Sequence, residues 1–367
     1  MLKLLASRLL AKFGYLNPSE KGDFMSDIKK KEEISRKAMH YEVLDSNIIK
    51  CKICGNECII PEGSLSRCKS RKNEAGTLKL PTYSVASSVA VDPVEKKPLY
   101  HFYPATNVFS LGGWGCNFCC IHCQNWQISQ PARKISRGSY YITPEEAVQL
   151  TLNHHARGIC WTYNEPAIWY EYTLDSARLA REAGLYTAYV TNGFLNEKPL
   201  REIAPYLDAY RVDFKGFSDK LYHELCSIKN WQIIYKNAAL ARELGMHVEV
   251  VTNIVPEYND DNETLKAIAE FTVKNIGPDT PWHISRFFPN NKLNSIPPTP
   301  METIEKAYNI GKEAGLYFIY KGNCPGKSDT ICPDCQTTAI ERNFSVKMNI
   351  NPDGTCKRCG KNLNVRC

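Results

Sequence analysis

The chain has 367 residues, of which 46 are Lys or Arg and 39 are Asp or Glu, so its formal net charge is +7. Its hydrophobic fraction of 43% supports a large core, which excludes a disordered or collagen-like chain. No stretch approaches the roughly 18 consecutive apolar residues of a membrane-spanning helix. We therefore expect a globular protein without a transmembrane segment.

Most of the 16 cysteines lie in three groups. The groups are Cys51, Cys54, Cys58 and Cys68; Cys116, Cys119, Cys120 and Cys123; and Cys332, Cys335, Cys356 and Cys359. Pairs with C-x2-C spacing hold metals far more often than they form disulfides with distant partners. Because no convincing secretory signal precedes them, we favour metal sites in a cytoplasmic protein over a disulfide framework.

The pattern of the chain predicts four segments. These are an N-terminal extension (1–47), a Cys-rich metal-binding module (48–104), an α/β segment (105–322) and a zinc-ribbon-like module (323–367). The extension combines apolar residues at helical spacing in 1–16 with a charged run at 29–33. It is expected to be an amphipathic helix followed by a solvated linker.

Within the third segment, short apolar runs alternate with helix signals. The runs predicted as buried strands are 108–111, 158–162, 186–190, 209–212, 247–251, 282–284 and 317–319. Thr143 and Thr299 each precede Pro and a Glu three residues on, which predicts two capping boxes. Gly184, Gly245 and Gly315 each separate a predicted helix from a strand.

These repeated helix-Gly-strand units predict parallel strands with crossover helices. A doubly wound sheet and a full or partial barrel both have this pattern. In both folds, the functional side chains lie beyond the C-terminal ends of the strands.

Cys116, Cys120 and Cys123 form a C-x3-C-x2-C pattern directly after a predicted strand. Three thiolates on one loop can hold three irons of a [4Fe-4S] cluster and leave the fourth iron open to another molecule. Structural zinc would need a fourth ligand. Cys119 is the available one, but neighbouring side chains diverge on most backbones, so zinc is the weaker alternative.

This loop and several later stretches resemble the radical S-adenosylmethionine (SAM) superfamily. Over roughly residues 48–362 they resemble the radical SAM enzyme of the AmmeMemoRadiSam system, a relative of pyruvate formate-lyase activating enzymes. The stretches are 51–68, 91–102, 116–130, 163–166, 191–193, 212–215 and 282–287. The resemblance implies a partial TIM-type (β/α)6 barrel flanked by the two Cys-rich modules.

The resemblance also implies the chemistry and its cofactors. In the superfamily the open iron binds the amino and carboxylate groups of SAM. One-electron reduction then cleaves SAM to a 5′-deoxyadenosyl radical that abstracts hydrogen from the substrate. No residue of this chain is assigned a catalytic role by the resemblance.

Side chains at strand ends are implied to bind SAM. They are Glu165, Thr191, Asn192, Asp213, Lys215 and His283, together with His122 in the cysteine loop. Glu165 offers a carboxylate to the SAM amino group, and Lys215 offers an ammonium to the SAM carboxylate. His122 stands where the family usually has an aromatic residue that packs on the adenine.

The outer cysteines predict two further metal sites. The pairs Cys332/Cys335 and Cys356/Cys359 are two C-x2-C knuckles, as in a zinc ribbon or a rubredoxin-like iron site. The group from Cys51 to Cys68 fits either zinc or a second iron-sulfur cluster. No metal role is expected for Cys119, Cys160, Cys226, Cys324 and Cys367.

The leading hypothesis is a cytoplasmic, oxygen-sensitive radical SAM enzyme that acts on a protein or peptide, by an activase-like or modifying reaction. Its electron would come from an external donor such as flavodoxin or ferredoxin. An alternative is a radical SAM C-methyltransferase that uses cobalamin, although nothing resembles the usual cobalamin-binding domain. A non-catalytic zinc-ribbon module that binds nucleic acid is the alternative from another class. The set of SAM residues argues against it, so we expect no nucleic-acid partner.

Overall fold

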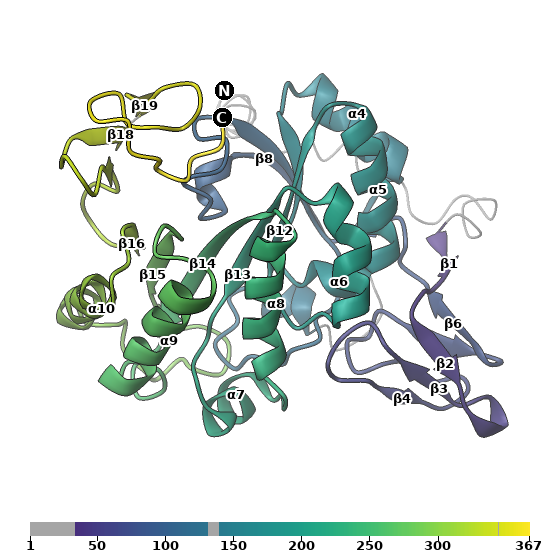
Figure 1. Ribbon diagram of the computed structural model, residues 1–367. Coiled ribbons are helices and arrows are strands. Elements are labelled where there is room, and N and C mark those ends of the chain that lie inside the picture. Colours follow the sequence, from purple (N-terminus) through teal and green to yellow (C-terminus); the bar gives the residue numbers. More distant parts are fainter. Residues whose placement is uncertain (1–33, 131–138, 344) are drawn as a thin grey trace, which may run out of the picture. The chain divides into compact units, whose positions relative to one another are not determined.

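The computed structural model describes residues 34–130, 139–343 and 345–367 (Figure 1). The helix predicted in residues 1–16 and the charged run at 29–33 lie outside these residues. The chain divides into two compact units. Unit 1 comprises residues 1–93, 107–118 and 125–207, and unit 2 comprises residues 94–106, 119–124 and 208–367. No helix in the described part is both long and apolar enough to traverse a bilayer.

Unit 1 contains parallel strands linked by helices. In spatial order its main strands are β8 (Ser88–Pro93), β9 (Asn107–Gly112), β11 (Gly158–Trp161) and β12 (Tyr186–Thr191). Strands β9, β11 and β12 are parallel, and β8 runs antiparallel to β9. Its helices are α3 (Trp126–Ser129), α4 (Pro144–Asn153), α5 (Tyr170–Glu182) and α6 (Glu197–Ile203).

Small antiparallel sheets carry the first cysteine group in unit 1. They are formed by β1 (Arg36–Lys37), β6 (Thr77–Leu80) and β5 (Lys72–Glu74); by β2 (Tyr41–Val43), β3 (Ile49–Cys51) and β4 (Ile59–Ile60); and by β7 (Val85–Ala86) with β10 (Tyr140–Tyr141). Their short strands place the cysteines at a strand end and in the adjoining loops.

Unit 2 repeats the strand-helix pattern. Its parallel strands are β13 (Ala209–Asp213), β14 (His247–Ile254), β15 (Trp282–Arg286) and β16 (Ile319–Gly322). The connecting helices are α7 (Asp219–Cys226), α8 (Gln232–Glu243), α9 (Asn262–Asn275) and α10 (Met301–Glu313). A terminal antiparallel sheet contains β17 (Thr330–Ile331), β18 (Thr338–Arg342) and β19 (Val346–Met348).

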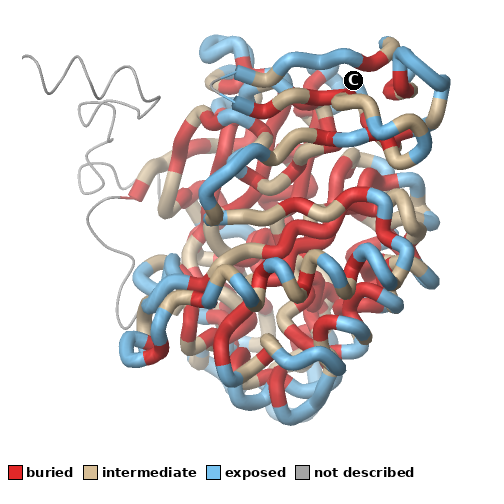
Figure 2. Tube along the Cα trace, turned by 90° about the vertical axis from the view of Figure 1, so that its left-hand side faces the viewer, coloured by how far each residue is buried: buried red, intermediate tan, exposed pale blue. Residues whose placement is uncertain are grey.

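The predicted α/β fold with parallel strands is confirmed. Strands such as β11 and β14 are buried along nearly their whole length. Figure 2 colours the buried stretches of the chain red. The three glycines predicted at helix ends all have positive φ, between 71° and 98°. The strand expected at 317–319 instead begins at Ile319, because Tyr317 lies in the preceding turn and is 43% exposed.

One of the two predicted capping boxes is confirmed. Thr143 accepts a hydrogen bond from the Glu146 N–H and its own N–H donates to the Glu146 carboxylate. The second prediction is wrong, because the buried Thr299 hydroxyl accepts from the Phe287 N–H and donates to the Ile254 carbonyl. Helix α10 therefore begins after Pro300 without a side-chain cap.

A buried ion pair joins the N-terminal sheets of unit 1 to helix α5. The two terminal nitrogens of Arg71 donate to the two carboxylate oxygens of Glu171, at 3.0 and 2.8 Å. The Met39 N–H donates to the same carboxylate at 2.6 Å. Arg71 is fully buried and Glu171 is 2% exposed, so removal of either partner leaves a buried charge without compensation.

We predict that Glu171→Ala lowers the free energy of unfolding by about 3–5 kcal/mol. The matched control is Glu197→Ala, which removes an exposed ion pair with Arg201 on helix α6 and should cost about 0.5 kcal/mol or less. Denaturant unfolding of both variants measures the difference. Equal losses in the two variants would contradict this account of unit 1.

Candidate active site and metal sites

In unit 1, the Glu165 carboxylate connects the ends of β11 and β12. Glu165 is 1% exposed and precedes the short 3-10 helix η4 (Pro166–Trp169). One carboxylate oxygen accepts from the Ala167 N–H at 3.0 Å and from the Thr191 hydroxyl at 2.7 Å. The other accepts from the Asn192 N–H at 2.7 Å. Three residues predicted to contact SAM are therefore brought together here.

Asn192 extends this network to the first cysteine of the central motif. Its side-chain amide donates to Asn117 Oδ1 at 2.7 Å and lies 3.8 Å from Cys116 Sγ. The Phe118 N–H also points to Cys116 Sγ, at 3.4 Å. N–H donors favour the charged form of a thiol, so this surrounding suits a thiolate ligand. Asn117 was not singled out from the sequence, where an Asn between two motif residues gives no signal.

Backbone contacts hold the loop that carries Cys116. The Asn164 amide donates to the Gly115 carbonyl at 2.7 Å, and the Gly115 N–H donates to Ile128. Gly115 has a φ of +95°, and a Cβ added there would lie 2.1 Å from the Cys68 carbonyl oxygen. A side chain at this position is therefore excluded both by the backbone and by the neighbouring loop.

In unit 2, the motif residues Cys119 to Ile121 pack against the end of helix α7. The Cys119 and Ile121 N–H groups donate to the carbonyls of Cys226 and Leu225. A hydrogen bond with the Cys226 side chain lowers the pKa of Cys120, and the Lys215 ammonium lowers it further against the effect of burial. Cys226 was predicted to have no metal role, yet it helps Cys120 to ionise.

Charged side chains gather at the end of β13. Asp213 forms ion pairs with Arg211 and, at 2.9 Å, with Lys215. Burial alone would raise the pKa of Asp213, but the two cations hold it below its ordinary value. Burial would lower the pKa of Lys215, but Asp213 and the nearby thiols raise it. Both groups are therefore charged at neutral pH.

His122, from the same part of unit 2, carries a neutral ring. Burial and then the Lys215 ammonium lower the pKa of His122 to about 3. Its Nδ1 atom is buried and finds no hydrogen-bond partner among the described residues. The structure thus supplies a planar, uncharged ring at the position where an adenine partner was expected.

His283 belongs to a buried network around Glu249 in strand β14. The Glu249 carboxylate accepts from His283 Nε2 at 2.6 Å and from His247 Nε2 at 3.0 Å. It also accepts from the backbone N–H groups of Tyr100 and His101, at 3.0 and 2.8 Å. Burial would raise the pKa of Glu249, but the hydrogen bonds and charges of His247 and His283 lower it below its ordinary value. This network was missed from the sequence because its members are far apart along the chain.

The four C-terminal cysteines form a compact cluster. The sulfur atoms of Cys332, Cys335, Cys356 and Cys359 all lie within 4.8 Å of one another. The Cys332–Cys359 and Cys335–Cys356 sulfur distances are 3.5 and 3.6 Å. A tetrahedral site with metal-sulfur bonds of about 2.3 Å needs sulfurs about 3.8 Å apart, so these four can hold one metal ion.

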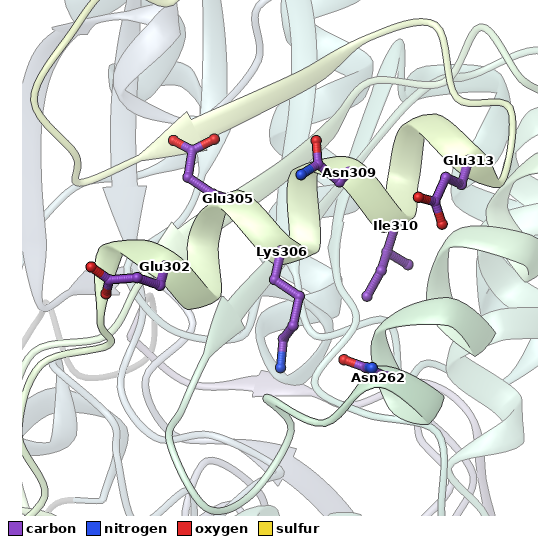
Figure 3. A pocket seen from close by; sticks show the side chains of 7 residues that line it. All are labelled: Asn262, Glu302, Glu305, Lys306, Asn309, Ile310 and Glu313. Carbon is purple, nitrogen blue, oxygen red and sulfur yellow. The ribbon is translucent and has the colours of Figure 1, made fainter.

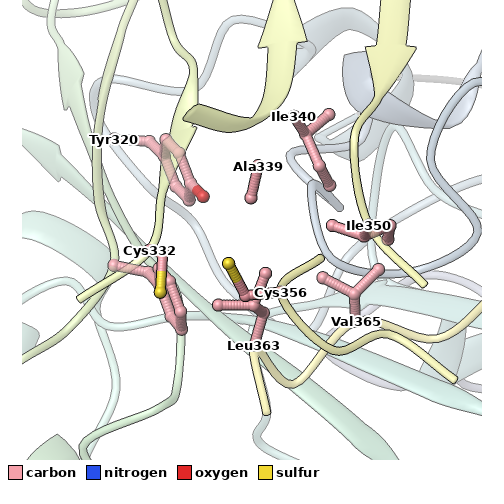
Figure 4. Packing of buried hydrophobic residues seen from close by; sticks show 9 residues of the cluster. Tyr320, Cys332, Ala339, Ile340, Ile350, Cys356, Leu363 and Val365 are labelled. Atoms are coloured by element: carbon pink, nitrogen blue, oxygen red, sulfur yellow. The ribbon is translucent and has the colours of Figure 1, made fainter. Parts of the chain in front are cut away.

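A small hydrophobic core supports this cysteine cluster. Its buried members are Phe318, Tyr320, Cys332, Ala339, Ile340, Ile350, Cys356, Leu363 and Val365. Figure 4 shows Cys332 and Cys356 beside Leu363 and Ala339 in this core. Hydrogen bonds from Thr337 lower the pKa of Cys335 to about 6, which favours the ligating thiolate.

A surface pocket in unit 2 lies away from the predicted strand-end residues. It is lined by Asn262, Glu302, Glu305, Lys306, Asn309, Ile310 and Glu313 (Figure 3). All but Asn262 come from helix α10. None of these side chains was predicted to contact SAM.

Comparisons with known proteins place the motif in a family. A model described as "Radical SAM superfamily" matches residues 113–272. An uncharacterized protein of Methanocaldococcus jannaschii is 43% identical over 337 residues, which is 90% of this chain and 99% of that protein. The pyruvate formate-lyase-activating enzyme of Clostridium pasteurianum is 25% identical over 172 residues, 44% of this chain and 67% of that enzyme.

A solved domain of a pyruvate-formate lyase-activating enzyme from Bacteroides vulgatus aligns at 17% identity with a TM-score of 0.40, over 45% of this chain and 99% of that domain. The matched stretch 113–272 contains the three cysteines of the C-x3-C-x2-C pattern and the strand ends of β11 to β13. The resemblance to the radical SAM superfamily and to pyruvate formate-lyase activating enzymes is therefore confirmed, and the chain belongs to the radical SAM superfamily.

Proposed function

We propose that this chain is a radical SAM enzyme that abstracts hydrogen from a protein or peptide substrate, in an activase-like or modifying reaction. A [4Fe-4S] cluster with bound SAM would supply the 5′-deoxyadenosyl radical. The observation that carries the proposal is the cysteine motif within the matched stretch, with thiols whose surroundings favour ionisation. Its kinship with activating enzymes supports a macromolecular substrate.

Cys116, Cys120 and Cys123 would hold the cluster. Cluster ligands are thiolates, and both environments described for these thiols favour the anion. Cys116 receives N–H donors from Phe118 and the Asn192 side chain. Cys120 receives a hydrogen bond from Cys226 and the field of Lys215.

The charged groups of unit 2 suit the polar parts of SAM. Lys215 keeps its ammonium charge and would pair with the SAM carboxylate, while ionised Asp213 would accept the ribose hydroxyls. When Lys215 pairs with the SAM carboxylate, the Arg211 guanidinium would still neutralise the Asp213 carboxylate. The neutral ring of His122 would stack on the adenine.

The four other proposed SAM residues are already hydrogen-bonded within the protein. Glu165 would act chiefly by fixing Thr191 and Asn192, whose side chains end β12. His283 would act by fixing the Glu249 carboxylate, because its Nε2 atom is hydrogen-bonded to Glu249. The Tyr320 ring stacks on the imidazole of His283. We therefore propose positioning roles for Glu165 and His283.

We propose zinc for the C-terminal cysteines, because their sulfur spacing fits one tetrahedral ion. This module and the N-terminal sheets would provide surfaces for the substrate or for a flavodoxin- or ferredoxin-like donor. A reducing cytoplasm is the compartment that keeps such thiolates available.

The central test compares Cys120→Ala with Cys119→Ala after anaerobic reconstitution and chemical reduction with SAM. We expect Cys120→Ala to form no 5′-deoxyadenosine above background, because one cluster ligand is lost. Cys119→Ala should retain most of the wild-type rate, since no metal role is expected for it. Chromatography with mass detection measures the product, and equal rates in the two variants would contradict the assignment.

The substrate class can be tested with a deuterated lysate of the producing cells, separated by size. We expect deuterium to enter 5′-deoxyadenosine when the protein fraction is added and not when the small-molecule fraction is added. Transfer from the small-molecule fraction alone would exclude a protein or peptide substrate. A product 14 Da heavier than its precursor, obtained with cobalamin present, would favour the methyltransferase alternative.

The C-terminal site predicts a specific metal loss. Cys356→Ser should lose about one zinc per chain and lower the thermal midpoint, because metal binding stabilises a module with a small core. Cys367→Ser, at an exposed cysteine outside the cluster, is the control and should change neither quantity. Metal analysis that finds equal zinc in both variants would contradict the site.

A further inference from the structure

The N-terminal cysteines of unit 1 gather around strand β3. Cys51 ends this strand, Cys54 and Cys58 lie in the loop to β4, and Cys68 lies in the turn before β5. The Cys51 N–H donates to the Cys58 carbonyl at 2.9 Å. Cys51, Cys54 and Cys68 are 4–6% exposed.

The spacing of these thiols differs from that of the C-terminal cluster. Within the described residues, the C-terminal cysteines are the one group of three or more such ligands whose atoms all lie within 4.8 Å. Among the N-terminal thiols, no three lie this close together. A single zinc needs sulfurs about 3.8 Å apart. In a [4Fe-4S] cluster each thiolate binds a different iron, so the sulfurs must be more widely spaced.

A buried cation lies beside the same thiols. Arg71 is fully buried and lies close enough to the Cys51 and Cys68 thiols to interact with them electrostatically. Two of its nitrogens bind Glu171, but its Nε–H is buried with no hydrogen-bond partner in the described part of the chain. A cluster bound by four thiolates carries net negative charge, which would compensate the positive charge of Arg71. Its sulfides could accept a hydrogen bond from the Arg71 Nε–H.

The N-terminal Cys-rich module contacts the loop that carries Cys116. The Cys68 carbonyl touches Gly115 so closely that no Cβ fits between them. The Ser70 hydroxyl donates to the Trp114 carbonyl at 2.6 Å, and the Asn56 amide donates to the Asn117 carbonyl at 2.8 Å. All of these residues belong to unit 1. The four cysteines therefore lie directly beside the first part of the active-site loop.

We propose that Cys51, Cys54, Cys58 and Cys68 ligate an auxiliary [4Fe-4S] cluster beside the Cys116 loop. This cluster would accept one electron from an external low-potential donor and would be reoxidised by passing that electron to the [4Fe-4S] cluster proposed at the Cys116 motif, which would be reduced in turn. No bond is made or broken and no proton moves. The electron-carrier role rests on the proposed radical chemistry, whereas the cluster itself does not.

The decisive variant is Cys116→Ala/Cys120→Ala/Cys123→Ala, which leaves the N-terminal module intact. After anaerobic reconstitution with iron and sulfide, we expect about four irons per chain in this variant and about eight in the wild type. When reduced, the variant should show the electron paramagnetic resonance (EPR) signal of a [4Fe-4S] cluster that SAM does not change. A variant without iron, or a wild type with only about four irons, would overturn the proposal.

A separate EPR measurement tests whether the auxiliary cluster lies beside the active-site loop. The EPR signal of the reduced wild type should be broader than the sum of two separate signals, because neighbouring paramagnetic clusters interact. The separate signals come from the triple variant and from Cys54→Ser/Cys68→Ser. If Cys54→Ser/Cys68→Ser does not fold, the spin relaxation of the wild type is compared with that of the triple variant. Faster relaxation in the wild type would also show that the two clusters are close.

A spectrum equal to the sum, or equal relaxation in the two proteins, would overturn this placement. Neither measurement requires SAM cleavage. A wild type with both clusters but without 5′-deoxyadenosine would therefore contradict the proposed function and leave the auxiliary cluster assigned.

Discussion

The hydrogen bonds of the Glu165 carboxylate are the interaction on which the organisation of unit 1 depends. This buried group accepts from Ala167, Thr191 and Asn192, and so fixes the ends of two parallel strands to each other. Asn192 then reaches Asn117, next to the first motif cysteine. Because an unpaired carboxylate would be costly at this depth, the charge and its donors specify one arrangement of the loop.

Compensation of buried negative charge recurs in both units. Lys215 and Arg211 accompany Asp213 and Cys120 in unit 2, and Arg71 accompanies Glu171 and Cys51 in unit 1. Thiolates bound to iron add further negative charge, so a nearby cation reduces the cost of burying them.

Local patterns made the fold largely predictable. Apolar runs, the Thr143 capping box and the glycines at helix ends depend on residues within a few positions of one another, and the structure confirms them. Thr299 was misread because its hydroxyl bonds to Phe287 and Ile254, which are distant in sequence. Long-range pairs such as Arg71–Glu171 leave no local signal.

The candidate site was predictable in its cysteines and only partly in its partners. The motif spacing identified Cys116, Cys120 and Cys123, but it could not show that Cys226 assists Cys120 or that Glu249 engages His283. Likewise, the spacing of Cys51 to Cys68 along the chain allowed zinc or a cluster. The cluster is favoured in the structure because no three of these thiols lie within 4.8 Å of one another and because Arg71 is buried beside them with an Nε–H left free by the described residues. The proposed function requires SAM to bind at the open iron of the active-site cluster. EPR of the anaerobically reduced wild type, recorded before and after addition of SAM, tests it most directly. We predict that SAM alters one of two cluster signals, whereas a spectrum unchanged by saturating SAM would contradict the claim.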